Sequence, residues 1–383
     1  MRVTRLLVFG LVAGLALSSA AVAGEAGFVP LFNGKDLSGW VRVNCAPETF
    51  TVRDGLIHCT GVPTGVLRTD KQYENFILEI EWRHMRPGGN AGLFAWSDPL
   101  TAPGVPFTRS IEIQILDGRN TENYTSHGDI FSIHGSTMKP DRPHPAGWKR
   151  CLPSERRCKP AGRWNHYRLV CNDGTIKLAV NGEVVSGASE CNYRKGYICL
   201  ESEGSEVHFR NIRIKQLSST NPKPEEIAKT AQDFTSLYTG VDLAGWKQDP
   251  GHEGHWQAKN WILNYDGKSQ AEDKNLRTEK DYGNFVLIFD CRLPGKAADC
   301  GLPIVLANGT PDIGNRAIAE QFQTGRWNRF VVTRQGDRLT LELNGHVVIA
   351  NARLSGVPPR GPIALRHVAG PIQFANLFIM ELH

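Results

Sequence analysis

A short alternating segment carries the side chains of this sequence that are best placed for chemistry. In the run Ile111-Glu-Ile-Gln-Ile115, Glu112 and Gln114 alternate with three isoleucines. Successive side chains of a β-strand point to opposite faces, so the isoleucines can join a core while Glu112 and Gln114 share the other face. A carboxyl and a carboxamide on such a face can hold a polar ligand, and a carboxyl of shifted pKa can transfer a proton. The alternative is an ordinary solvated sheet face.

The same segment lies within a long insertion, residues 97–161, that also carries imidazole and amino groups. His127, Asp129, His134 and Lys139 stand there among glycines and short polar residues, a composition typical of loops over a site rather than of a core. Loops on a rigid scaffold are where binding and catalytic residues concentrate. For each residue alone, an ordinary loop position explains the composition equally well.

Some of these side chains are also metal ligands. A divalent ion held by Glu112 together with His127, Asp129 or His134 is chemically reasonable, because imidazole and carboxylate groups suit such ions. No two of these residues have a recognised ligand spacing. The sequence therefore leaves open whether a divalent metal or any other cofactor is bound.

Two further alternating segments, residues 76–83 and 197–203, carry acidic groups on one strand face. The polar side chains are Glu79, Glu81 and Arg83 in the first segment, and Glu201 and Glu203 in the second. Several carboxyls beside an arginine, as in the first segment, can have their pKa values pushed apart, as acid–base catalysis requires, and the second segment could line an active site. Both segments are therefore candidates for a site surface.

The elements that must position these residues occur twice. Four blocks recur in the same order, residues 31–40 as 237–246, 67–83 as 276–292, 162–165 as 325–328, and 196–217 as 361–382. Such a repeat predicts two copies of one fold. The insertion is specific to the first copy, because 65 residues separate Trp96 from Gly162 whereas 19 separate the corresponding Val305 and Gly325.

Each copy has the pattern of an all-β domain. Short alternating segments are separated by turn signals, such as Asn172-Asp-Gly174 and Asn181-Gly182. Asn-Gly between apolar alternation is a strong hairpin signal because both residues tolerate positive φ. Many short strands at this spacing predict a β-sandwich or jelly roll.

The chain divides into four segments. Arg2 and Arg5 precede an apolar run and small residues up to Ala23, which predicts a signal peptide over residues 1–23 and a secreted or periplasmic protein. Residues 24–217 form the first copy with its insertion, 218–234 a Ser/Pro-containing linker, and 235–383 the second, shorter copy.

Composition excludes several partners. The formal charge of +5 comes from 44 Lys and Arg against 39 Asp and Glu without any long basic run, so nucleic-acid binding is not expected. No segment is apolar enough for a membrane span. Of the nine cysteines, the pairs Cys45/Cys59, Cys151/Cys158 and Cys291/Cys300 are close enough in sequence to bridge, and none is forced to.

Five motifs in a fixed order resemble a known family. They are Leu-Phe-Asn-Gly-Lys-Asp-Leu-Ser-Gly-Trp at 31–40, Gly-Gly-Asn-Ala-Gly at 88–92, Ile-Glu-Ile-Gln-Ile-Leu-Asp at 111–117, Gly-Arg-Trp-Asn at 162–165 and Phe-Arg-Asn-Ile-Arg-Ile at 209–214. The series resembles the 3-keto-disaccharide hydrolase domain family. The resemblance covers nearly all of residues 28–217 and, more thinly, 235–382, where the Glu-x-Gln block has no counterpart. It implies two tandem concanavalin A-like β-sandwich (jelly-roll) domains and a carbohydrate substrate.

The resemblance also implies a reaction. A ketone at C3 of a glycoside acidifies the proton on C2, so that a base can form an enolate and the C1–O bond can break by elimination, after which water adds back. We expect Glu112 or His134 as the base and Arg83 or a bound metal at the enolate oxygen. Asp129 or Glu201 would orient the substrate or protonate the leaving group.

The remaining candidates would bind the sugar. Gln114, His127, Glu201 and Lys139 offer hydrogen bonds, and Trp96, at a strand end, offers a ring on which a sugar face could stack.

Two other functions fit the same residues. A non-catalytic glycan-binding module is one, since the fold alone does not determine function. A retaining glycosidase is the other, and it would need two acids about 5–5.5 Å apart. Glu112 has no second acid two residues away on its own strand, where Ser110 and Gln114 stand, although a neighbouring strand could supply one.

Overall fold

The computed structural model describes residues 25–117, 127–145, 147, 149–293, 302–306, 315–367 and 370–383. The predicted signal peptide, residues 1–23, lies outside the described residues. Within those ranges, no helix combines the length and apolarity needed to cross a membrane.

The first copy contains a nine-stranded antiparallel sheet. Eight strands follow one another across it: β10 (Thr137–Pro140), β14 (Glu183–Asn192), β13 (Thr175–Val180), β12 (Asn165–Asn172), β6 (Phe76–His84), β16 (Val207–Gln216), β4 (Leu56–Cys59) and β3 (Phe50–Arg53). The ninth, β1 (Val29–Pro30), pairs with β16.

A seven-stranded sheet packs against it. The strand order is β11 (Arg150–Cys151), β9 (Ile130–Ile133), β8 (Ser110–Gln114), β7 (Gly92–Ser97), β15 (Tyr197–Ser202), β5 (Gly65–Thr69) and β2 (Trp40–Arg42). Ile111 and Ile113 of β8 and Trp82 of β6 are all buried in one core between the two sheets. The side chains that alternate with them therefore lie on the two outer faces of the sandwich.

The second copy repeats the arrangement with a smaller second sheet. Its eight-stranded sheet has the order β18 (Trp256–Lys259), β19 (Ile262–Tyr265), β27 (Ile372–Glu381), β21 (Phe285–Arg292), β23 (Asn328–Gln335), β24 (Arg338–Leu343) and β25 (His346–Arg353), with β17 (Thr235–Ser236) beside β27. A three-stranded sheet, β20 (Leu276–Tyr282), β26 (Gly361–Leu365) and β22 (Ile304–Leu306), covers it. One described α-helix, α1 (Asn315–Gln321), precedes β23. The prediction of an all-β chain of two tandem concanavalin A-like, jelly-roll-type sandwiches is confirmed.

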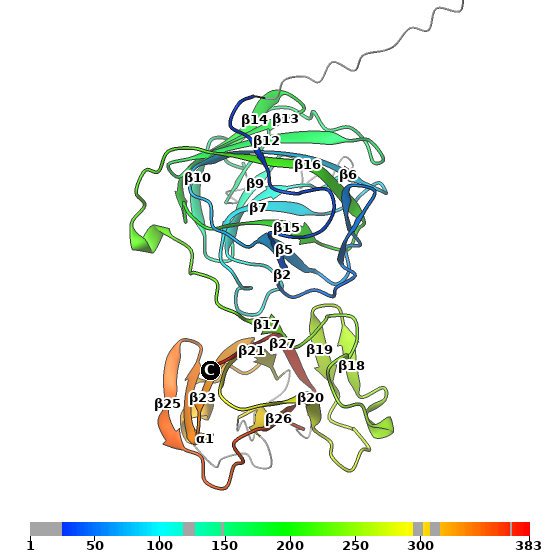
Figure 1. Cartoon of the computed structure of the whole chain (residues 1–383), viewed down its shortest axis with the longest axis vertical. Helices are drawn as coiled ribbons and strands as arrows, with labels where there is room; N and C mark the ends of the chain where they lie inside the picture. The colour runs from blue at the N-terminus through cyan, green and yellow to red at the C-terminus, as the bar shows by residue number, and fades with distance from the viewer. Residues whose placement is uncertain are drawn as a thin grey trace, which may run out of the picture.

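The seven-stranded sheet lies on the side of the first copy that faces the second copy (Figure 1). Val66 and Phe94 on the outer face of this sheet share an apolar cluster with Phe378 and Ile288 of the second copy. Their burial supplies a hydrophobic contact between the copies.

Asp290 of the second copy anchors that contact. Its side chain is fully buried, forms an ion pair with Arg329 at 2.7 Å, and accepts a hydrogen bond from the backbone N–H of Gly104 at 2.8 Å. Asn376 donates to the same carboxylate at 2.6 Å and to the carbonyl of Val105 at 2.9 Å. A buried carboxylate with this many donors is well satisfied, so it fixes the insertion of the first copy against the second.

The cysteine pairs near the start of the chain and in the insertion do not bridge. Cys45 and Cys59 are buried thiols, each directed at a backbone carbonyl, and burial raises the pKa of both to about 12. Cys151 likewise carries a thiol directed at a backbone carbonyl. Cys300 of the third pair lies outside the described residues.

Candidate functional site

Two carboxyl groups meet over a glycine on the outer face of the seven-stranded sheet. Glu112 of β8 pairs with Phe94 of β7, and Leu200 of β15 pairs with Leu93, so that Glu201 comes beside Gly92. A Cβ atom on Gly92 would stand 2.8 Å from Oε2 of Glu201 and 3.2 Å from Oε1 of Glu112. The absence of a side chain at Gly92 therefore leaves the space in which the two carboxyls approach each other across the middle strand.

A third carboxyl completes the group through an amide chain. Nε2 of Gln114 donates to Oδ1 of Asn90 at 2.6 Å, and Nδ2 of Asn90 donates to Glu203. The hydroxyl of Ser205 donates to the carbonyl of Asn90 at 2.8 Å and accepts from its N–H at 2.6 Å. This series of hydrogen bonds orients both amides, so Asn90 and Gln114 form a fixed polar border beside the carboxyls of Glu112 and Glu201.

All three carboxyls hold protons more tightly than ordinary glutamates. Burial, followed by the charges of Glu203 and Asp129, raises the pKa of Glu112 to about 8. Burial, followed by the charges of Glu112 and Glu203, raises the pKa of Glu201 well above its usual range, and burial raises the pKa of Glu203. Like charges in a desolvated site disfavour simultaneous ionisation, so at neutral pH the group shares protons.

Glu201 is the most deeply buried of the three carboxyls. It is 1% exposed, and its Oε2 atom finds no hydrogen-bond partner among the described residues. A buried polar atom without a partner is costly, and such atoms concentrate where a ligand or a reacting group completes the set. Glu201 is therefore suited to hold a proton that a substrate can take.

An ion pair borders the site on the other side. Asp129 precedes β9 and receives the N–H of Gln114 at its carbonyl, at 2.9 Å. Its carboxylate lies 2.9 Å from Nε of Arg150 in β11, and both side chains are buried. The guanidinium of Arg150 also lies over the ring of Phe131, the residue that pairs with Glu112 across β9 and β8. Arg150 is therefore a buried, paired cation on edge strand β11, with Phe131 of β9 between it and Glu112.

A family model for the 3-keto-alpha-glucoside-1,2-lyase-like domain matches residues 27–215 and 304–380 of this chain. The chain belongs to this family. The match falls in two segments, one in each copy, and both the carboxyl group pair and Arg150 lie in the first.

Individual relatives are more distant. A 3-keto-disaccharide hydrolase of Bacteroides thetaiotaomicron is 25% identical and aligns over 50% of this chain and 79% of its own length. Among solved structures, a candidate glycosyl hydrolase of Parabacteroides distasonis shares 24% identity, with a TM-score of 0.39, over 50% of this chain and 94% of that one. A carbohydrate-binding module of Bacillus subtilis shares 11% identity, with a TM-score of 0.34, over 46% of this chain and 96% of that one.

In this family member, Arg83 is not beside Glu112, contrary to the prediction. Arg83 lies on β6 in the nine-stranded sheet, and its guanidinium stacks over Trp164 at 4.6 Å. Because Arg83 and Glu112 both alternate with core residues, they occupy the two opposite outer faces of the sandwich. Lys139, on edge strand β10 of the nine-stranded sheet, is exposed and pairs with Glu190 at 3.3 Å.

Trp96 is not available for stacking on a sugar. Its ring is 1% exposed in the core, and its Nε1 donates to the carbonyl of Glu74 at 2.8 Å. The register between β7 and β15 shifts between Tyr197 and Cys199, and Trp96 has a φ of 55°. A bulge of this kind breaks the alternation, so the ring turns inward where a regular strand would have turned it outward.

The two predicted histidines are separated from the carboxyls and from each other. His127 is buried and stacks on Trp82, with ring centroids 4.7 Å apart, on the core side of the sheet. His134 is exposed and stacks on Phe107, which in turn contacts Phe94. Aromatic rings therefore stand between His134 and Glu112, and His134 is not placed to act as the base.

The predicted metal ligands are not assembled either. His127 is in the core, His134 lies beyond Phe107, and Asp129 is paired with Arg150. Among the described residues, neither histidine lies beside Glu112, so the predicted combination of imidazole and carboxylate ligands is not formed.

Sequence reasoning missed three of the residues that make the site. Asn90 and Gly92 belong to the Gly-Gly-Asn-Ala-Gly motif. Asn90 orients the amide chain and Gly92 leaves space for the carboxyls, and both roles depend on the position of β7 between β8 and β15. Arg150 belongs to a basic stretch that reads as surface, and only its pairing with the buried Asp129 distinguishes it.

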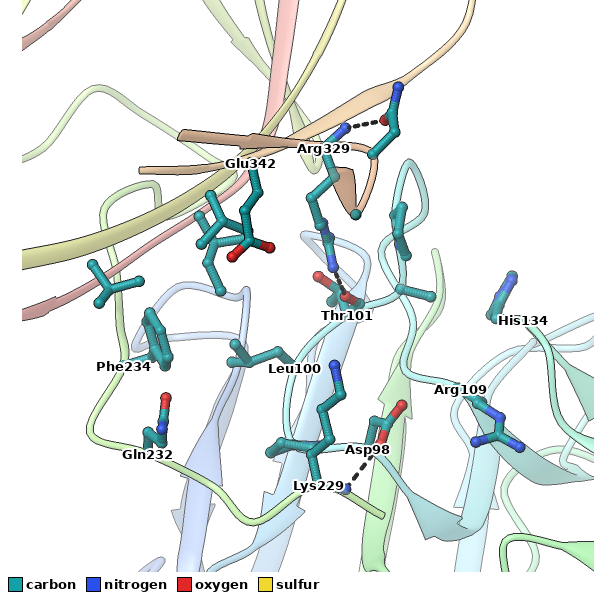
Figure 2. Close-up of a pocket in the computed structure, with 18 of the residues that line it drawn as sticks. Asp98, Leu100, Thr101, Arg109, His134, Lys229, Gln232, Phe234, Arg329 and Glu342 are labelled. Carbon is teal, nitrogen blue, oxygen red and sulfur yellow. Dashed lines mark hydrogen bonds between the residues drawn. The ribbon is translucent and has the colours of Figure 1, made fainter. Parts of the chain in front are cut away.

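A separate cavity of about 1090 Å³ lies between the copies (Figure 2). The first copy contributes Asp98, Leu100 and His134, and the second contributes Glu342. Figure 2 shows Glu342 and Lys229, a linker residue, pointing into this space. Neither Glu112 nor Glu201 lines it, so it is distinct from the carboxyl site.

Proposed function

We propose that this chain is a carbohydrate-active enzyme that cleaves 3-keto-glycosides by elimination followed by hydration. The observation that carries the proposal is the pair of carboxyls of Glu112 and Glu201, which share the space over Gly92 and both have raised pKa values. Two adjacent carboxyls that do not ionise together can serve as base and acid in one reaction. Membership of the family supports the substrate class.

Glu112 is the base in this proposal. Its pKa of about 8 leaves a fraction ionised at neutral pH and makes the carboxylate a stronger base than an ordinary glutamate. The carboxylate takes the proton from C2, and the electron pair of that bond forms the enolate C2=C3–O⁻. When the C3 ketone re-forms, a C1=C2 double bond appears and the C1–O bond breaks.

Glu201 is the acid. Burial and the charges of Glu112 and Glu203 raise the pKa of Glu201 well above its usual range, so Glu201 holds a proton at neutral pH and can give it to the departing oxygen. Water then adds its hydroxyl to C1 and its remaining proton passes to Glu201, while Glu112, whose carboxyl proton has exchanged with solvent between the two steps, protonates C2. The sum of the two steps is hydrolysis, and both carboxyls recover their starting protonation.

Arg150 replaces Arg83 as the group that stabilises the enolate. Its guanidinium is buried and held by Asp129, whose charge is close enough to raise the pKa of Glu112. A preorganised cation in a desolvated site stabilises developing negative charge without reorganisation.

The test is incubation of the protein with a 3-keto-glucoside and with its unoxidised parent. We expect release of the leaving group from the oxidised sugar only, and loss of that release in Glu112→Gln. Glu81→Gln is the matched control, because Glu81 pairs with Arg210 on the opposite outer face. Binding of both sugars without turnover would instead support a glycan-binding module.

The same two carboxyls also favour one alternative, a retaining glycosidase. A Cβ atom at Gly92 would lie 3.2 Å from Oε1 of Glu112 and 2.8 Å from Oε2 of Glu201. The distance between these two oxygens therefore cannot exceed the sum of those two distances. That bound accommodates the spacing of about 5–5.5 Å that retaining enzymes use. Release from the unoxidised sugar with retained configuration at C1 would select this function.

We also propose export and the division of the chain. The basic and then apolar start of the sequence supports cleavage near Ala23, followed by a first domain to residue 217, a linker to 234 and a second domain. Mass spectrometry of the protein recovered from the periplasm or medium should give a chain that begins near Gly24. Recovery of the uncleaved chain from the cytoplasm would contradict this.

A further inference from the structure

Two histidines and a glutamate meet on the outer face of the nine-stranded sheet, away from the carboxyl site. His58 of β4 and His208 of β16 are directly paired in register, and their ring centroids are 3.9 Å apart. Glu206, just before β16, brings Oε1 to 2.8 Å from Nε2 of His208. One ligand atom from each residue lies within 4.8 Å of the others.

One of these ring nitrogens is buried and makes no hydrogen bond to the described residues. Nε2 of His58 has no hydrogen-bond partner within the part of the chain that the structure describes. A buried ring nitrogen in that position needs an explanation, and a bound ion is a common one.

We propose that His58, Glu206 and His208 bind a divalent transition-metal ion, with Zn²⁺ as the best fit. Two imidazoles and one carboxylate suit Zn²⁺, Co²⁺ or Ni²⁺ and are poor for Ca²⁺ and Mg²⁺, which prefer oxygen ligands. With ligand atoms within 4.8 Å of one another, an ion placed between them would be bound at metal–ligand distances of about 2.0–2.2 Å after side-chain adjustment.

Two arginines lie beside the three proposed ligands, and one of them would have to move when an ion binds. Arg83 brings Nη2 to 3.4 Å from Nδ1 of His208, and Arg53 lowers the pKa of His58. When Nε2 of His208 binds an ion, Nδ1 carries the proton, so Arg83 must turn away. In the same position its guanidinium also stacks over Trp164.

The ion would clamp a turn that supports the carboxyl site. Glu206 lies on the turn that also carries Glu203 and Ser205, and both of these hold Asn90. An ion that ties Glu206 to β4 and β16 would restrain this turn. Its role is structural, and it stands independently of the proposed reaction on 3-keto-glycosides.

The test uses the full chain without a histidine tag, stripped of metal and titrated with Zn²⁺ by calorimetry, with Mg²⁺ and Ca²⁺ in parallel. We expect one Zn²⁺ per chain, a higher Tm in its presence, and no comparable response to Mg²⁺ or Ca²⁺. His58→Ala and Glu206→Gln should each weaken Zn²⁺ binding by at least about tenfold. His255→Ala, a histidine paired with Asp266 in the second copy, should leave it unchanged.

Failure of the wild-type chain to bind Zn²⁺, or equal affinity in both site variants, would overturn the proposal. Glu206 is exposed, so Glu206→Gln tests the site even if His58→Ala destabilises the sheet. Circular dichroism of each variant without metal shows that a lost response is not lost folding.

Discussion

Glu112 and Glu201 belong to strands that are not neighbours, and Gly92 of the strand between them is what lets their carboxyls share one space. Phe94, two residues along β7, pairs with Glu112 and carries its ring on the same face. The polar site therefore ends where the apolar cluster of the copy interface begins.

Gly92→Ala tests that relationship. The added Cβ would stand 2.8 Å from Oε2 of Glu201 and 2.9 Å from Cε1 of Phe94, so the Glu201 carboxyl and the Phe94 ring must both shift. We expect kcat/KM to fall by about 10²-fold with the fold retained, because a displacement of about 1 Å in a catalytic group has effects of that size. The control is Gly283→Ala, where the nearest atom is 3.3 Å away in the flexible side chain of Arg360. Unchanged kinetics in Gly92→Ala would mean that the two carboxyls need not be so close.

The rate should depend on pH through Glu112. The base must be ionised and its pKa is raised to about 8, so kcat/KM should rise about tenfold per pH unit below 8 and level off above it. Loss of the proton of Glu201 would lower the rate again at higher pH, because the pKa of Glu201 lies well above its ordinary value. Steady-state kinetics from pH 5 to 10 on a 3-keto-glucoside provides the measurement. A profile that is already flat from pH 5 upward would remove Glu112 from the role of base.

Arg150→Lys should lower kcat by at least about tenfold with little change in KM. Lysine keeps the charge but loses the planar guanidinium that Asp129 holds, so the cation is no longer fixed at the enolate. Arg83→Ala, on the opposite outer face, should leave kcat as it is. If Arg83→Ala lowered kcat and Arg150→Lys did not, Arg83 would be the cation at the enolate and the reaction would take place on the nine-stranded sheet.

Asp290→Ala should destabilise the protein through the contact between the copies. It would leave Arg329 without its buried partner and the N–H of Gly104 without its acceptor, at a cost of about 3–5 kcal/mol. Asp337→Ala provides the comparison, because its pair with Arg353 is exposed and should contribute no more than about 1 kcal/mol. Urea unfolding of both variants measures the difference, and equal losses would mean that the copies do not depend on Asp290.

The fold and part of the site could be predicted because alternation assigns a side chain to a face. Ile111 and Ile113 are in the core, and Glu112 and Gln114 lie together on the other side, as their spacing indicates. Repetition of the motif blocks predicts two sandwiches for the same reason, since each block carries one set of core positions.

Alternation does not say which of the two outer faces a residue occupies. Glu112 and Arg83 have the same pattern and lie on opposite sides of the sandwich, because strand order is a long-range property that local spacing does not contain. Trp96 fails for a different reason, since a bulge reverses its direction. Asp129 and Arg150 find each other through the neighbouring ends of β9 and β11, which the sequence of the insertion does not reveal.

The most direct test follows the hydrogen on C2. Hydrolysis of a 3-keto-glucoside in D₂O is sampled by NMR at early times, with an enzyme-free reaction to measure spontaneous exchange and Glu112→Gln as the inactive control. Elimination and hydration predict one deuterium at C2 in each product molecule and none gained in Glu112→Gln. Product that keeps its original hydrogen at C2 would contradict elimination, and the remaining mechanism would be direct displacement of the leaving group at C1.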